Sequence, residues 1–313
     1  MSADGLSSRA IIGSFYNTLD QDSGAGWVSK LAMKFNSDQS SEEYKWLGNA
    51  PKMREWIGGR QAKGWVENGL IIKNKQYEAT VYFYTQELRR DKTGQTLVRI
   101  NELAQGTNTH WASLLSTLML NGDSTVCYDG QFFFDTDHSE GDSGTQSNEI
   151  DADISTFPAT VHGVTTAPSI EEMQQSVFKG ITQILSFKDD QGEPMNEGAN
   201  KFIVMVPPSL FITAGNAFKS NPSNDINQMS PLSRFTVDVE VNSRLTWTDK
   251  FMVARTDGQT KPFIQQAETD VVLKVQGAGS QIEFDKNQHA YGVDCWRNVG
   301  YGFWQHACLV TMI

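Results

Sequence analysis

The chain has 313 residues, of which 39% are hydrophobic and 20% charged, and its formal net charge is −11. This composition excludes a disordered chain, and a transmembrane protein is excluded because no apolar run approaches the roughly 18 residues that span a bilayer. The net negative charge argues against a protein whose whole surface binds nucleic acid, since phosphate binding requires clustered Lys and Arg. Residues 1–5 show no basic patch followed by an apolar stretch, so we expect no secretory signal.

Three cysteines are far apart in the sequence and show no metal-ligand spacing: Cys127, Cys295 and Cys308. We expect buried, reduced thiols. Residues 1–45 are rich in Ser, Gly, Asp and Asn but carry scattered large apolar residues. They predict a polar arm with short helical pieces. The arm packs either on its own body or on a neighbouring subunit, and the sequence does not separate these alternatives.

Residues 60–92 predict an extended β-hairpin. Residues 77–84 are β-branched and aromatic, as strands prefer, and residues 69–72 form an earlier candidate strand. Charged residues crowd this region. They indicate either a solvated hairpin or a projecting loop that meets neighbours through complementary charge.

A long helix is expected over residues 96–120, because apolar residues recur at helical spacing and Asn121-Gly122-Asp123 is a good stop. Gly106 and Thr107 are candidate kink positions. Residues 128–138 are apolar in the centre and predict a strand. Residues 139–168 are rich in Ser, Gly, Asp and Thr and predict a long loop.

Ser169 and Glu172 form a capping box that opens a second helix. Its expected buried face is Ile170, Met173, Val177, Ile181 and Ile184. Further expected elements are a central strand at 201–206, a short helix at 208–218, and strands at 235–241, 251–254 and 271–275. The order of elements indicates an α+β fold without internal repeats and without a clear interdomain linker.

Asp135, Asp137 and His138 are the strongest catalytic candidates, because two carboxylates and an imidazole are able to bind a divalent metal or exchange protons. A metal-dependent hydrolase is therefore one hypothesis. On a strand, however, the two carboxylates share one face and His138 points to the other. Structural hydrogen bonding is the plainer explanation. The loop 139–144 resembles an ion-binding loop but lacks EF-hand and P-loop spacing. We expect no catalytic residues, no metal and no cofactor.

Large aromatic residues lie outside any catalytic context. They are Trp46, Trp56 and Trp65 near the predicted hairpin, and Trp296, Tyr301, Phe303 and Trp304 near the C-terminus. Such residues are favoured in protein interfaces, but they also fill ordinary cores.

Three stretches in order resemble one family. They are residues 46–60 (Trp46-Leu47-Gly48, then Pro51 to Arg60), residues 128–138 (Tyr128-Asp129-Gly130-Gln131 to His138), and residues 291–305 (Tyr291-Gly292-Val293-Asp294, then Asn298 to Gln305). Together they are similar to the Mu-like phage major head subunit family. Ser139 stands where the family often has Pro, and residues 139–285 match only loosely.

The resemblance implies an HK97-like capsid fold. Residues 1–45 would be the N-terminal arm, and 46–138 the extended loop, with its reach-over part at 60–92, and the long spine helix of the peripheral domain. Residues 139–285 would be mainly the axial domain with peripheral strands. Residues 286–313 would be C-terminal strands that return to the body.

The implied function is that of a structural major capsid subunit. It would self-assemble into pentamers and hexamers of an icosahedral phage head, in the host bacterial cytoplasm, and become part of the virion. Implied partners are further copies of the chain, a scaffolding protein, a portal, an optional decoration protein and packaged double-stranded DNA bound without sequence specificity. A negatively charged shell wall would not bind its packaged DNA strongly. The same net charge is also explained by the ordinary need of a protein for solubility. An encapsulin-like shell is the alternative with the same fold.

Assembly requires an interface and a hinge. The candidate inter-subunit residues are Arg60, Lys63, Trp65, Glu67, Lys73, Lys75, Glu87, Arg89 and Arg90. Because one sequence must fill both pentamers and hexamers, we expect a hinge at Gly58, Gly59 and Gly64.

Overall fold

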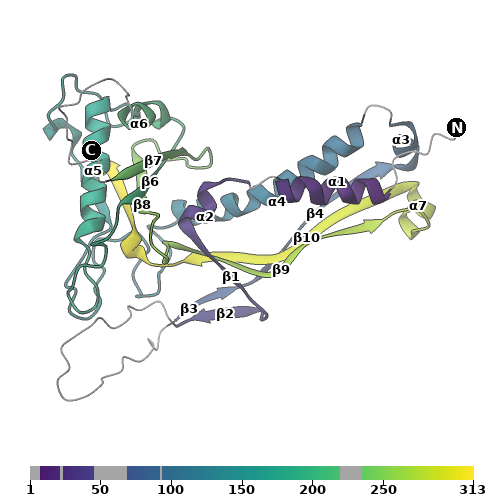
Figure 1. Cartoon of the computed structure of the whole chain (residues 1–313), viewed down its shortest axis with the longest axis horizontal. Helices are drawn as coiled ribbons and strands as arrows, with labels where there is room; N and C mark the ends of the chain where they lie inside the picture. Colours follow the sequence, from purple (N-terminus) through teal and green to yellow (C-terminus); the bar gives the residue numbers. More distant parts are fainter. Residues whose placement is uncertain (1–7, 22–23, 46–68, 92–93, 219–234) are drawn as a thin grey trace, which may run out of the picture.

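The computed structural model describes residues 8–21, 24–45, 69–91, 94–218 and 235–313. Figure 1 shows three parts: a lobe that holds the C-terminus, a long arm, and a two-stranded ribbon near the place where lobe and arm join. Among the described helices, none is long and apolar enough to cross a membrane.

The arm is a four-stranded sheet with helices on one face. Its strands, in spatial order, are β1 (Ala32–Asn36), β9 (Phe263–Gln276), β10 (Gln288–Tyr301) and β4 (Lys75–Tyr84). The helices are α1 (Ser8–Gln21) and α4 (Gln95–Leu120), with α3 (Thr85–Arg90) and α7 (Gln281–Lys286) at the far end (Figure 1). Ile11 and Phe15 of α1 and Ile100 of α4 are fully buried against Phe83 and Tyr291 of the sheet. Apolar burial on this face therefore fixes both helices to the sheet.

The helix α4 confirms the expected long helix. It runs for 26 residues, a length of about 39 Å, and Gly106 and Thr107 do not interrupt it. The Asp91 carboxylate accepts hydrogen bonds from the backbone N–H groups of Gly94, Gln95 and Thr96, which satisfies donors that the first turn leaves free. The arm thus has a rigid, capped rod along its whole length.

The lobe contains a five-stranded sheet. Its strands, in spatial order, are β5 (Glu149–Ala152), β11 (Ala307–Met312), β8 (Lys250–Arg255), β6 (Lys201–Val206) and β7 (Thr236–Val241). The helices nearby are α2 (Trp27–Leu31), α5 (Ile170–Ser186) and α6 (Phe211–Ala217), with short 3-10 helices η1 (Ile154–Thr156) and η3 (Trp304–His306). The capping box of α5 is confirmed: Ser169 Oγ accepts from the N–H of Glu172, and the Glu172 carboxylate accepts from the N–H of Ser169. Ile170, the first residue of the helix, is 49% exposed, whereas the other four expected residues are buried.

The predicted hairpin has the wrong strand pairing. The strand β3 (Leu70–Lys73) pairs antiparallel with β2 (Ser41–Tyr44), and β4 pairs with β10. Only Asn74 separates β3 from β4, and a single residue is too short for a hairpin turn, so the chain continues from one sheet into the next. We call the pair β2 and β3 the ribbon. It brackets residues 45–69, of which 46–68 lie outside the described residues.

The strand predicted at 128–138 is also wrong. Short bridges join Val126 to Phe132 and His138 to Gln146, and the chain turns at Gly130, which has a φ of 90°. Phe133 and Phe134 are both buried, so side chains do not alternate between two faces as a strand requires. The regular strand, β5, instead lies inside the predicted loop 139–168. All three cysteines are buried and free, as expected.

Candidate assembly interface

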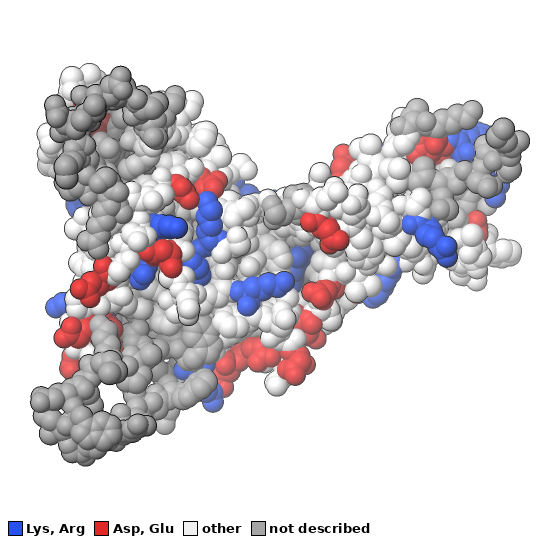
Figure 2. All heavy atoms as spheres, in the orientation of Figure 1, with Lys and Arg blue, Asp and Glu red and all other residues white. Residues whose placement is uncertain are grey.

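The structure separates the residues expected at the interface. Arg60, Lys63, Trp65 and Glu67, together with the expected hinge Gly58, Gly59 and Gly64, lie outside the described residues. Lys73 and Lys75 lie at the base of the ribbon, whereas Glu87, Arg89 and Arg90 lie in α3 at the far end of the arm (Figure 1). Figure 2 shows the described Lys and Arg side chains mixed with Asp and Glu over the visible face, without one basic patch. The charges therefore do not form a single described surface.

Gln266 of β9 holds the base of the ribbon and is fully buried. Its Oε1 accepts a hydrogen bond from the Tyr44 hydroxyl of β2 at 2.8 Å. Its Nε2 donates to the Ile72 carbonyl of β3 at 3.1 Å and to Asn74 Oδ1 at 2.8 Å. One side chain thus binds both strands of the ribbon to the arm sheet.

Strand β10 holds the ribbon on a second side. Asn298 Nδ2 donates to the Lys73 carbonyl at 2.7 Å. Ile72 packs directly over Gly300, where a β-carbon would lie 2.2 Å from Ile72 Cδ1. We call Gln266, Asn298 and Gly300 the ribbon anchor. Sequence reasoning missed all three as functional residues; the only signal was that Asn298 and Gly300 lie within the family-like stretch 291–305.

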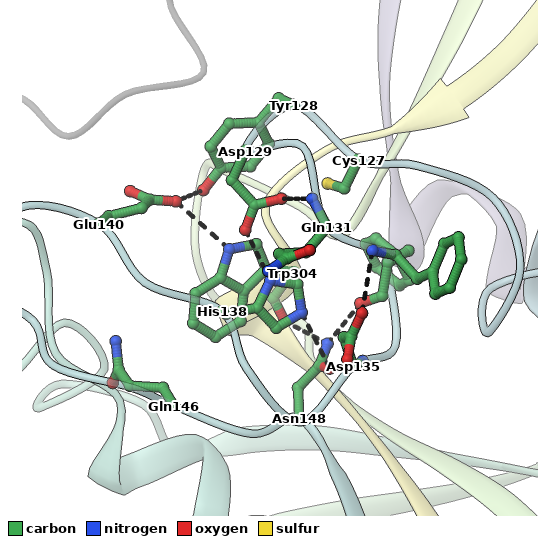
Figure 3. Close-up of polar contacts among 12 residues, drawn as sticks. Cys127, Tyr128, Asp129, Gln131, Asp135, His138, Glu140, Gln146, Asn148 and Trp304 are labelled. Carbon is green, nitrogen blue, oxygen red and sulfur yellow. Dashed lines mark hydrogen bonds and ion pairs between the residues drawn. The ribbon is translucent and has the colours of Figure 1, made fainter.

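The second family-like stretch surrounds a buried histidine (Figure 3). His138 has no exposed surface; its Nδ1 lies 2.6 Å from Asp129 Oδ2 and its Nε2 lies 3.3 Å from Asn148 Oδ1. Both partners present oxygen atoms to the two ring nitrogens. The ring stacks on Trp304, with 4.0 Å between centroids and 8° between planes. These contacts join the 128–138 stretch to η3 near the C-terminus.

Glu140 forms the other half of this cluster. Its Oε1 accepts from the Tyr128 hydroxyl at 2.5 Å and from Trp304 Nε1 and Gln305 Nε2, each at 3.3 Å (Figure 3). Burial, and then the negative charge of Asp129, raise the pKa of Glu140 despite these hydrogen bonds. The cluster is therefore a structural junction with two buried carboxylates.

The proposed metal site is not formed. His138 points into the cluster, whereas Asp135 accepts from the backbone N–H groups of Phe132 and Thr136, and Asp137 is exposed. A hydrogen bond to Asp135 raises the pKa of Asp137, so these two carboxyl groups interact with each other. In the part of the chain that the structure describes, no three His, Cys, Asp or Glu residues are placed to hold a metal ion. The hydrolase hypothesis loses its candidate site.

The expected interface aromatics have different positions. Tyr301, Phe303 and Trp304 are buried in the body, whereas Trp296 is 36% exposed on the arm sheet. Trp46, Trp56 and Trp65 lie outside the described residues. The C-terminal aromatics are therefore mainly core residues.

We expect Glu140→Gln to change how stability depends on pH. Because the folded-state pKa of Glu140 is raised, its protonated form favours folding below the unfolded-state pKa, and this contribution is lost as pH rises through the folded-state value. The variant keeps an oxygen acceptor but does not titrate. Denaturant unfolding at several pH values should show the wild type gaining stability relative to the variant as pH falls from 7 toward 4. A relative loss on acidification would contradict this account.

The fold is that of phage capsid proteins. The chain is similar to a subunit of the procapsid of bacteriophage JBD30, with a TM-score of 0.57, 22% identity, and coverage of 97% of this chain and 74% of that chain. It is also similar to the JBD30 capsid, with a TM-score of 0.52, 15% identity and coverage of 92% and 65%. The capsid of cyanophage P-SCSP1u gives a TM-score of 0.53, 10% identity and coverage of 90% and 86%. The chain therefore has the HK97-like α+β fold.

The family follows from the sequence match. The model of the Mu-like prophage major head subunit gpT matches residues 9–159 and 235–312, which is more than half of the chain, so the chain belongs to this family. It is 32% identical over 139 residues to the Mu-like prophage FluMu major head subunit of Haemophilus influenzae, covering 44% of each chain. It is 34% identical over 110 residues to the major capsid protein of Escherichia phage Mu, covering 35% of this chain and 36% of that one. The aligned segments thus span less than half of these relatives. The family match favours a phage head protein over the encapsulin-like alternative.

Proposed function

We propose that this chain is the major capsid subunit of a phage head, which self-assembles into pentamers and hexamers of an icosahedral shell around double-stranded DNA. The family match over residues 9–159 and 235–312 carries the proposal. Its role is structural rather than enzymatic, and the chain becomes part of the virion after assembly in the host bacterial cytoplasm.

The ribbon supports this proposal. It packs against the body, with Tyr44 and Ile72 buried beside Ile264 and Phe303, and the ribbon anchor fixes it to the arm sheet. The ribbon brackets the segment that we propose to contact a neighbouring copy. In a closed lattice each subunit has many neighbours, so weak individual contacts raise the effective concentration and stabilise the shell together.

The finer assignments are part of the same proposal. Residues 1–45 form the N-terminal arm, 46–138 the extended loop and spine helix, 139–285 mainly the axial domain and 286–313 the returning strands. Arg60, Lys63, Trp65, Glu67, Lys73 and Lys75 near the ribbon contact a neighbouring copy, as do Glu87, Arg89 and Arg90 at the end of the arm. The further partners are a scaffolding protein, a portal and, where one is present, a decoration protein.

Electron microscopy of the purified chain tests the proposal. We expect closed particles from the wild type. Replacing Gly58, Gly59 and Gly64 with Val should reduce closed particles much more than it reduces thermal stability, because bulkier residues restrict the backbone freedom that a hinge needs. Normal particles from the triple variant would refute the hinge. A wild type that remains monomeric at high concentration, with native circular dichroism, would refute the shell.

A further inference from the structure

A groove lies between α4 and β4, at the edge of the arm sheet. Its volume is about 330 Å³, and its walls include Tyr77 of β4, Leu103 of α4 and Val293 of β10. In the described sheet, β4 has no strand on its outer side, so the groove opens where another chain is able to approach. Apolar walls at an open sheet edge suit the stem of an incoming side chain.

Arg297 of β10 also lines this groove and is only 4% exposed. Its Nη2 donates to the Thr107 carbonyl at 3.0 Å, and its guanidinium lies 4.8 Å from the centre of the Trp111 ring. Its Nε has no hydrogen-bond partner among the described residues. Glu78 and Glu102 also line the groove, but both are exposed, and no described ion pair joins either carboxylate to the guanidinium. A buried charge without a counter-ion raises the free energy of the folded state, so the guanidinium of Arg297 would be stabilised by an anionic partner.

His110 lines the groove beside Arg297. Its ring lies 4.4 Å from Tyr77, and its Nδ1 is buried without a partner in the described chain. Burial, and then repulsion from Arg297 and Arg244, lower the pKa of His110 to about 4. The imidazole is therefore neutral at pH 7, and the nearest positive charges are those of the two arginines. Two cations are too few for a DNA-binding surface, but one guanidinium is well suited to one carboxylate.

We propose that this groove is a carboxylate-binding site, and that an acidic side chain of a second copy of this chain fills it on assembly. The inference rests on the proposed function, because copies of the chain are then the commonest neighbours. The chain carries 37 Asp and Glu against 26 Lys and Arg, so carboxylates are also the commonest charge on such a neighbour. A carboxylate that pairs with Arg297 supplies the missing counter-charge and brings the two subunits into one register.

Arg297→Met tests the inference. Methionine keeps an unbranched apolar stem but carries no charge. The unassembled variant should therefore unfold at the same or a higher temperature than the wild type. The concentration at which particles form, measured by sedimentation, should rise about tenfold, as expected for the loss of a charge-assisted contact. The matched control is Lys274→Met, which removes an exposed cation that pairs with Asp294 at 2.6 Å on the same sheet. The control should leave the assembly threshold unchanged.

The outcomes separate the inference from the proposed function. Wild-type particles with an unchanged threshold for Arg297→Met would overturn the inference and leave the shell intact. A variant that loses thermal stability in step with assembly would show that Arg297 only supports the fold, and would also overturn it. A reconstruction of wild-type particles decides the matter independently of any variant. It should show a carboxylate oxygen of a neighbouring copy about 3 Å from the guanidinium. A carboxylate of the same chain, a different protein or water in the groove would contradict the inference.

Discussion

Gly300→Val is expected to give a folded, soluble chain that does not form closed particles. At this position a β-carbon would lie 2.2 Å from Ile72 Cδ1, 2.7 Å from Ile72 Cγ1 and 3.4 Å from Leu70 Cδ2. Ile72 is 4% exposed and its β-branched side chain has few alternative rotamers, so β3 itself must move. Such overpacking costs about 1–3 kcal/mol of folding free energy, which the body is able to tolerate. The larger effect is on the ribbon, because the movement breaks the bond between Gln266 and the Ile72 carbonyl.

The control for this experiment is Gly198→Val, since no heavy atom lies within 4 Å of a β-carbon at Gly198. The double variant Gly300→Val with Ile72→Ala should recover particles in part, because alanine lacks the two atoms that the new side chain meets. Particle yield is measured by electron microscopy, and folding by thermal circular dichroism. Normal yields from the single variant would show that the position of the ribbon base is irrelevant to assembly.

Asp129→Ala is expected to have the largest effect on folding. It leaves His138, which has no exposed surface, without its 2.6 Å partner and next to Trp304. Leaving a buried hydrogen-bonding group without its partner costs about 1–3 kcal/mol, and more for a charged group. Denaturant unfolding followed by circular dichroism should show a loss of this size.

Asp137→Ala is the matched control, because this carboxylate is exposed on the same stretch and should change stability by no more than about 0.5 kcal/mol. The pair of variants also separates two views of the stretch 128–138. A metal site in this stretch would require Asp137 as a ligand and would not require Asp129. Equal losses from the two substitutions would contradict the structural role assigned to the His138 cluster.

Local signals in the sequence were sufficient for several elements. The capping box at Ser169 and the apolar stripe of α4 depend on residues three or four positions apart, so a single segment carries the whole pattern. The free, buried cysteines follow from their number and spacing. The family-like stretches gave the HK97-like fold, because they occur in the family's order.

Long-range pairing was not predictable in the same way. The ribbon joins Ser41–Tyr44 to Leu70–Lys73, and the sequence Ser-Glu-Glu-Tyr shows little of the β-branched content typical of strands. Gln266 and Arg297 read as ordinary polar residues of strands, and their burial depends on partners more than 180 residues away. The stretch 128–138 looked like a strand because it is aromatic, whereas its side chains fill a junction with η3.

A reconstruction of wild-type particles at side-chain resolution tests the central claim most directly, by locating the ribbon and residues 45–69 relative to other copies. The account predicts closed shells in which this segment lies on an adjacent subunit while its base keeps the contacts of Gln266 and Asn298. A segment folded back on its own subunit, with no neighbouring copy in contact, would contradict the assignment of this chain as a shell-forming subunit.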